Sequence, residues 1–249
     1  MADSVVMPYI VMALVLFLLA VLIRKAPLPK VETNEEELAE KNQTAETTIF
    51  QFPNLWFGVL SLFVYVGAEV IAGDTIIAYG MSLGFTGEEA KYFTPYTLFA
   101  MVITYALGVF LIPKYISQKT ALVASAVLGI VFSCCILVTT GFTSVLFVAA
   151  LGIANALVWP TVWPLTLAGL GKFTQTASAL LIMAIAGGAI IPPLYGRMVD
   201  AYKIKFVANQ MDETVALAKA SSESYWILIP CYVIILFFAI WGHKLKRWN

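Results

Sequence analysis

Long apolar stretches are the feature that most constrains what this chain can fold into. Several run for about 20 residues, the length an α-helix needs to cross the hydrocarbon core of a bilayer. Of the 249 residues, 61% are hydrophobic and 12% are charged, whereas soluble domains have about 45–50% apolar and about 25% charged residues. A soluble fold of this composition would expose large apolar patches and aggregate. The chain is therefore predicted to be an all-α polytopic membrane protein.

About seven transmembrane helices are expected from these stretches. Their ranges are roughly 5–23, 54–78, 94–113, 119–140, 143–168, 175–197 and 225–242. The first stretch is unlike a secretory signal peptide, because its positive charges follow the apolar run instead of preceding it. With the N-terminus outside, ten Lys and Arg residues face the cytoplasm and five face out. Cytoplasmic loops carry the excess of Lys and Arg, so the N-terminus is predicted outside and the C-terminus inside.

Residues 25–52 differ in composition from the rest of the chain. Six glutamates lie within 31–48. Thr33 followed by Glu36 matches a capping box, so this linker either forms a short cytoplasmic helix or is a solvated hinge between membrane bundles. A second polar insert covers roughly 198–224.

Enzyme, metal, cofactor and nucleic-acid functions find no support in the residues. Formal net charge is zero, which leaves no basic field for nucleic acid. The only histidine, His243, lies in the C-terminal tail, which excludes His-based zinc sites and a serine–histidine–aspartate triad. A retinal protein is excluded because no span carries a central lysine. An intramembrane aspartyl protease is excluded because Asp74 has no second membrane aspartate to form a dyad. ATP-driven function has no support because no phosphate-binding glycine-rich loop is present.

Two carboxyl groups lie within the second span. Ionisable residues at membrane depth are costly and usually face a cavity or a partner. Glu69 is near mid-span, and Tyr65 lies one helical turn earlier on the same face; Asp74 is rotated off that face, closer to the outer end. Glu69 is interpreted as a substrate or proton ligand, with a structural carboxyl bonded to a neighbouring helix as the alternative. Asp74 is a second proton-coupling candidate, or a residue that reaches interfacial water.

The fifth span places polar and aromatic side chains on one helix face. Asn155, Trp159, Trp163 and Thr166 are spaced by four, four and three residues. An amide and indole rings suit a sugar, whose hydroxyls need hydrogen bonds and whose C–H face stacks on aromatic rings. Packing or lipid-facing tryptophans are the alternative.

The sixth span opens with polar residues and continues through small ones. Gln175 and Ser178 are weaker candidates at the inner end of a cavity. The glycine–alanine stripe that follows allows close helix packing. Pro160 and Pro164 interrupt the fifth span, and Pro192–Pro193 interrupt the sixth. The double proline is either a gate hinge or a fixed kink.

Several segments resemble the fucose–proton symporter family of the major facilitator superfamily, which includes bacterial glucose/galactose transporters. The segment Tyr65-Val-Gly-Ala-Glu69-Val resembles that family's seventh-helix motif. Residues 159–172 and 178–192 are similar to its tenth and eleventh helices, and residues 112–118 to its eighth-to-ninth loop. Pro8-Tyr9 ahead of an apolar run resembles the start of its sixth helix. Thr104-Tyr105-Ala106 stands where a glycine–arginine pair is common.

The resemblance implies a particular domain organisation. Family members have twelve helices in two six-helix halves, and only the sixth helix, the central loop and the C-terminal half have counterparts here. Residues 1–24 would then be the last helix of an absent N-terminal half, 25–52 the cytoplasmic linker and 53–249 a six-helix C-terminal bundle.

The resemblance also implies a function. The expectation is proton-coupled transport of a hexose or deoxyhexose across a bacterial inner membrane by alternating access, with this chain forming one wall of the midplane cavity. Substrate-binding candidates are Glu69, Tyr65, Asn155, Trp159, Trp163, Gln175 and Ser178. The expected partners are the sugar, the proton, the bilayer and an N-terminal half on the same or a separate chain. The alternative is a truncated or orphan half without transport activity of its own.

Overall fold

The computed structural model describes residues 3–25 and 48–245. The chain divides into two units, residues 1–41 and 42–249. The described helix of the first unit is α1 (Asp3–Lys25), whose large apolar side chains are exposed, with Phe17 at 69%. Most of the predicted linker, including the Thr33–Glu36 capping box, lies outside the described residues.

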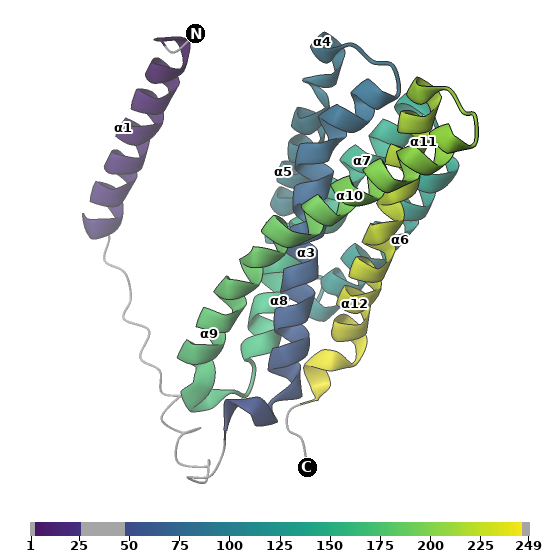
Figure 1. The fold of residues 1–249 in the computed structure, drawn as a ribbon. Helices are drawn as coiled ribbons and strands as arrows, with labels where there is room; N and C mark the ends of the chain where they lie inside the picture. Colours follow the sequence, from purple (N-terminus) through teal and green to yellow (C-terminus); the bar gives the residue numbers. More distant parts are fainter. Residues whose placement is uncertain (1–2, 26–47, 246–249) are drawn as a thin grey trace. The chain divides into compact units, whose positions relative to one another are not determined.

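The second unit is a bundle of helices (Figure 1). Its helices are α3 (Pro53–Ser82), α4 (Gly87–Ala90), α5 (Phe93–Leu111), α6 (Gln118–Val138), α7 (Gly141–Ala156), α8 (Val158–Leu167), α9 (Thr174–Met183), α10 (Gly187–Ala208), α11 (Glu213–Ser224) and α12 (Leu228–Ile240). Short 3-10 turns are η1 (Ile49–Gln51), η2 (Gly171–Phe173), η3 (Ala184–Ala186), η4 (Tyr225–Ile227) and η5 (Gly242–Lys244). Among the described residues, six helical segments are long and apolar enough to cross a membrane, and α1 adds the shorter apolar stretch Tyr9–Leu19. The predicted all-α polytopic fold is confirmed.

Two of the predicted spans are interrupted helices. The fifth divides at Leu157, where φ is −95° and ψ is 0°. Pro160 has no N–H to donate to the carbonyl four residues earlier, so the helix breaks before it and the proline falls in the first turn of α8, where it is tolerated. The sixth passes through η3 before the prolines, and α10 continues through Pro192 and Pro193 to Ala208. The polar insert at 198–224 is therefore largely helical.

Helix α3 is the central element of the bundle. It packs against α5, α7, α8, α10 and α12, as its position in Figure 1 shows. At one end, Asn54 Nδ2 donates to the Thr166 carbonyl at 3.0 Å, and Gly58 leaves the room that the Thr166 side chain fills. At the other end, the Tyr79 hydroxyl lies 2.6 Å from Ser144 Oγ, which donates to the Ile136 carbonyl. These buried hydrogen bonds tie the two ends of α3 to α8 and α7, although Asn54 Oδ1 itself has no partner.

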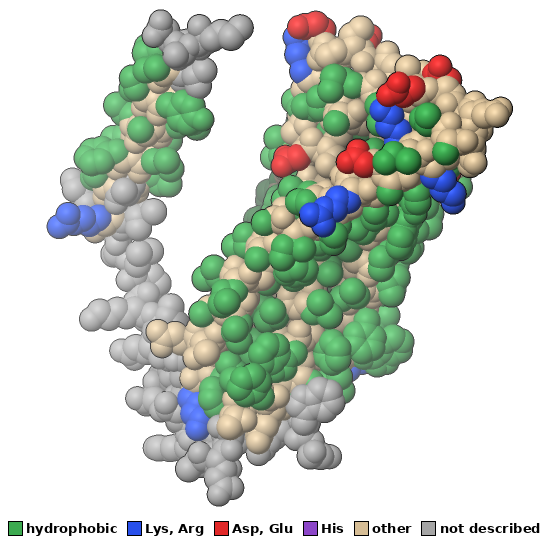
Figure 2. All heavy atoms as spheres, viewed as in Figure 1, with side chains coloured by type: hydrophobic (Ala, Val, Ile, Leu, Met, Phe, Trp, Pro, Cys, Tyr) green, Lys and Arg blue, Asp and Glu red, His purple; other side chains and the backbone are tan. Residues whose placement is uncertain are grey.

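Hydrophobic side chains cover the middle of the bundle, and charged side chains gather near α4 and α11 (Figure 2). Exposed apolar residues on α5 include Val109 and Phe110, at 76% and 75%. A surface of this kind requires an apolar solvent, which a bilayer supplies. The charged end marks where the bundle meets water.

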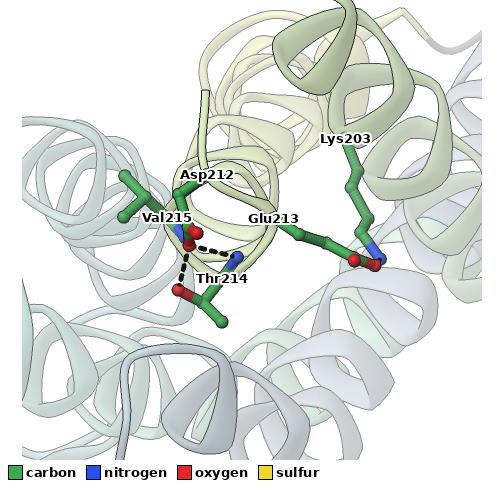
Figure 3. A network of polar contacts seen from close by, with 5 residues as sticks. All are labelled: Lys203, Asp212, Glu213, Thr214 and Val215. Carbon is green, nitrogen blue, oxygen red and sulfur yellow. Dashed lines mark hydrogen bonds and ion pairs between the residues drawn. The ribbon is translucent and has the colours of Figure 1, made fainter. Parts of the chain in front are cut away.

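Helix α11 begins with a side-chain cap at this charged end. Asp212 Oδ1 accepts a hydrogen bond from the Thr214 N–H at 2.9 Å and a longer one from the Val215 N–H. Nearby, Lys203 of α10 pairs with Glu213 of α11 at 2.7 Å (Figure 3). The ion pair is solvent-exposed, so it contributes little, about 0–1 kcal/mol. The cap is the principal local signal that starts the helix, because it satisfies N–H groups that have no partner within the helix.

Replacing Asp212 with Ala should therefore fray the first turn of α11. The hydrogen bonds that Asp212 accepts from Thr214 and Val215 lower its pKa. A lowered pKa in the folded state means that the cap stabilises α11 at neutral pH and is lost as the pH falls through the folded value. Amide exchange at Thr214 and Val215 is the measurement. Asp212→Asn retains an acceptor, so it should protect both amides independently of pH. Equal exchange in the Ala and Asn variants would contradict the capping role.

Candidate functional site

Glu69 and Tyr65 lie side by side on α3. Tyr65 is buried, with 1% of its surface exposed, whereas Glu69 is partly exposed. The Tyr65 hydroxyl lies beside the Glu69 carboxyl. This follows from their spacing of one helical turn, which puts both side chains on the same face.

Two further tyrosines lie within electrostatic range of the Glu69 carboxyl. Tyr105 comes from α5 and Tyr232 from α12. Tyr65 is the phenol beside this carboxyl, and Tyr105 and Tyr232 act on it from a longer distance. Phenols donate and accept hydrogen bonds, but the Tyr232 hydroxyl is buried and already donates to Asn155. Tyr105 is the partly exposed phenol that a ligand hydroxyl can reach. Neither tyrosine was predicted as a site residue, because a tyrosine in an apolar span looks the same whether it faces a site or the core.

A tryptophan pair extends this region onto α8. The rings of Trp159 and Trp163 stack, with centroids 5.8 Å apart and planes at 23°. Trp159 also packs against Tyr65, at a centroid distance of 6.5 Å. The pair borders a hollow of about 470 Å³ that is completed by Pro160, Pro164 and Ile182. The hollow is open to the surface and is a candidate for one wall of a binding site.

Asn155 does not line this hollow. It is fully buried near the end of α7, and its Oδ1 accepts a hydrogen bond from the Tyr232 hydroxyl at 2.9 Å. Its Nδ2 has no hydrogen-bond partner. The break at Leu157 separates Asn155 from the α8 residues, so the predicted four-residue face is divided between two helices. Thr166, at the far end of α8, is fully buried against α3.

The remaining candidates lie elsewhere. Asp74 is exposed and borders a different cavity, of about 630 Å³, which Tyr195 and Asp200 of α10 also line. Gln175 is exposed and Ser178 half-buried on α9. Within residues 48–245, no side-chain hydrogen bond joins any of these three to Glu69. Nor do the described residues bring together three side chains that could hold a metal ion.

Several known proteins are similar to this chain in sequence, although no family model matches it. The glucose/galactose transporter of Brucella abortus is 29% identical over 246 residues, which are 98% of this chain and 55% of that protein. The L-fucose–proton symporter of Haemophilus influenzae is 26% identical over 249 aligned residues, covering 95% of this chain and 52% of the relative. The homologues of this chain are sugar transporters.

A solved structure shows the same fold. The chain superposes on the fucose:proton symporter FucP of Escherichia coli with a TM-score of 0.72 at 21% identity, over 94% of this chain and 54% of that one. The chain spans about half the length of the curated relatives it matches, and the matched part is their C-terminal half. The predicted resemblance and the major facilitator fold are confirmed. The homologues are named as transporters.

Proposed function

We propose that the chain forms one half of the cavity of a proton-coupled sugar transporter of the bacterial inner membrane. The observation that carries this proposal is the partly exposed Glu69 carboxyl beside Tyr65, whose ring packs against the stacked pair of Trp159 and Trp163. The substrate is a hexose or deoxyhexose, such as glucose, galactose or fucose. The names of the homologues support the substrate class.

Each wall residue has a chemical role in this proposal. The indole faces of Trp159 and Trp163 stack on the apolar C–H face of the sugar ring. The Glu69 carboxylate accepts hydrogen bonds from sugar hydroxyls, and the Tyr65 hydroxyl holds that carboxylate in place. Proton coupling uses Glu69 or Asp74. Gln175 and Ser178 of α9 would meet the sugar only near the inner end of the pathway.

The wall is open on one side, which is what alternating access between two bundles requires. An N-terminal half, on the same or a separate chain, would close the cavity and rock against this one. Residues 1–24 would belong to that half, residues 25–52 would be the linker, and residues 53–249 the C-terminal bundle. The distribution of Lys and Arg supports an outer N-terminus and a cytoplasmic C-terminus.

Sugar binding by the purified chain in nanodiscs tests the proposal. D-glucose, D-galactose and L-fucose are titrated by calorimetry. Trp159→Ala removes the stacking platform and should weaken binding of the preferred sugar about tenfold, which corresponds to about 1.4 kcal/mol. The control is Trp241→Ala, since Trp241 is exposed near the C-terminal end of α12. Equal affinities of wild type and Trp159→Ala, or binding of none of the three sugars, would overturn the proposal.

A further inference from the structure

Tyr232 is a buried residue of α12 whose hydroxyl reaches Asn155 of α7. Its ring is fully buried, and it fits against Gly129 of α6, where a Cβ atom would overlap the ring. The ring position is therefore set by a gap that glycine leaves. With the ring in this position, the Tyr232 hydroxyl donates a hydrogen bond to Asn155 Oδ1 at 2.9 Å.

Asn155 is the penultimate residue of α7, two residues before the break at Leu157. α7 ends at Ala156, the chain leaves the regular helix at Leu157, and α8 begins at Val158. Trp159 is the second residue of α8 and packs on Tyr65. The bond to Asn155 therefore lies four residues before the ring through which α8 meets Tyr65 of α3.

Burying the Asn155 amide at this position costs free energy. Only its Oδ1 is satisfied, and Nδ2 has no hydrogen-bond partner. Buried polar groups without partners are rare in folded proteins, and an apolar side chain of similar size would fill the same space without this cost. The hydrogen bond to Tyr232 is the one side-chain interaction that offsets the cost of burying the Asn155 amide.

We propose that Tyr232 is a positioning residue for the sugar site. Through Asn155 it fixes the α7–α8 break, and so it holds the Trp159 ring against Tyr65. Tyr232 does not touch the sugar, since it is fully buried. The expected effect on sugar affinity rests on the proposed sugar-binding function. The positioning of Trp159 rests on the contacts described above.

Tyr232→Phe tests this by removing the hydroxyl while keeping the ring. The first measurement is the 19F spectrum of the chain labelled with 5-fluorotryptophan, without sugar, with the Trp159 signal assigned from Trp159→Phe. The second is the sugar affinity in nanodiscs. Tyr79→Phe is the matched control, because Tyr79 is equally buried and its hydroxyl also pairs with a side chain, Ser144, in a different part of the bundle.

The expected result is a shifted Trp159 signal and an affinity about fivefold lower in Tyr232→Phe, the effect of losing one net hydrogen bond. Tyr79→Phe should change neither. In an Asn155→Leu background, Tyr232→Phe should add no further loss, because the two residues act through one bond. An unshifted signal, or losses that multiply in the double variant, would overturn the inference. If wild type binds no sugar, the proposed function fails, and the 19F comparison still decides whether Tyr232 positions Trp159.

Discussion

Glu69→Gln should weaken sugar binding about 10- to 100-fold and remove its dependence on pH. The substitution keeps the side-chain volume but replaces the charged acceptor with a neutral amide. Hydrogen bonds to charged groups contribute about 1.5–3 kcal/mol, which corresponds to this range of affinity. Because a glutamine cannot take up a proton, an affinity that varies with pH in wild type should become flat in the variant. Calorimetric titration of the preferred sugar at several pH values measures both effects.

Two other carboxyl variants define what the Glu69 result means. Asp200→Asn is the control, since Asp200 is exposed on α10 and lines the cavity away from the tryptophan pair. It should leave affinity and pH dependence unchanged. Asp74→Asn separates the two coupling candidates: if it alone flattens the pH profile, the proton role moves from Glu69 to Asp74. Wild-type affinity in Glu69→Gln would remove Glu69 from the binding site altogether.

Gly187→Ala should produce the largest loss of stability among single-methyl changes in the bundle. Gly187 begins α10, and a Cβ atom there would overlap the backbone carbonyl of Phe63 in α3. A backbone atom cannot turn aside as a flexible side chain can, so the two helices must separate. Overpacking typically costs about 1–3 kcal/mol, and a backbone clash places this variant at the upper end, about 3 kcal/mol. Unfolding of the purified chain in detergent with increasing denaturant measures the difference.

Gly196→Ala is the matched control for this prediction. Gly196 lies on the same helix, and a Cβ atom there would meet no other atom within 4 Å. Alanine is favoured over glycine within a helix by about 1 kcal/mol, so this variant should be slightly more stable than wild type. If Gly187→Ala and Gly196→Ala changed the free energy of unfolding in the same direction, the close α3–α10 packing would be contradicted.

Local patterns in the sequence were sufficient to predict the helical bundle and the pairing of Tyr65 with Glu69 in the candidate site. Seven apolar runs of membrane-spanning length predicted the all-α fold, because length and hydropathy are properties of a segment by itself. The spacing of Tyr65 and Glu69 placed them on one face, because a regular helix relates residues four apart. The same rule failed across Leu157, where the helix breaks and Asn155 turns towards α12.

What the sequence alone determined is the set of helices, their membrane character and the presence of a carboxyl group at membrane depth. What only the tertiary structure decided is which helices meet around that carboxyl. Tyr105 and Tyr232 are 36 and 163 residues away from Glu69 along the chain, and no helical period connects them to it. They come within electrostatic range of Glu69 because α5, α7 and α12 pack around α3 and α6. Glycines such as Gly129 leave the room that large rings fill. Side-chain packing between distant segments has no local signature, so it becomes visible only when the bundle is assembled.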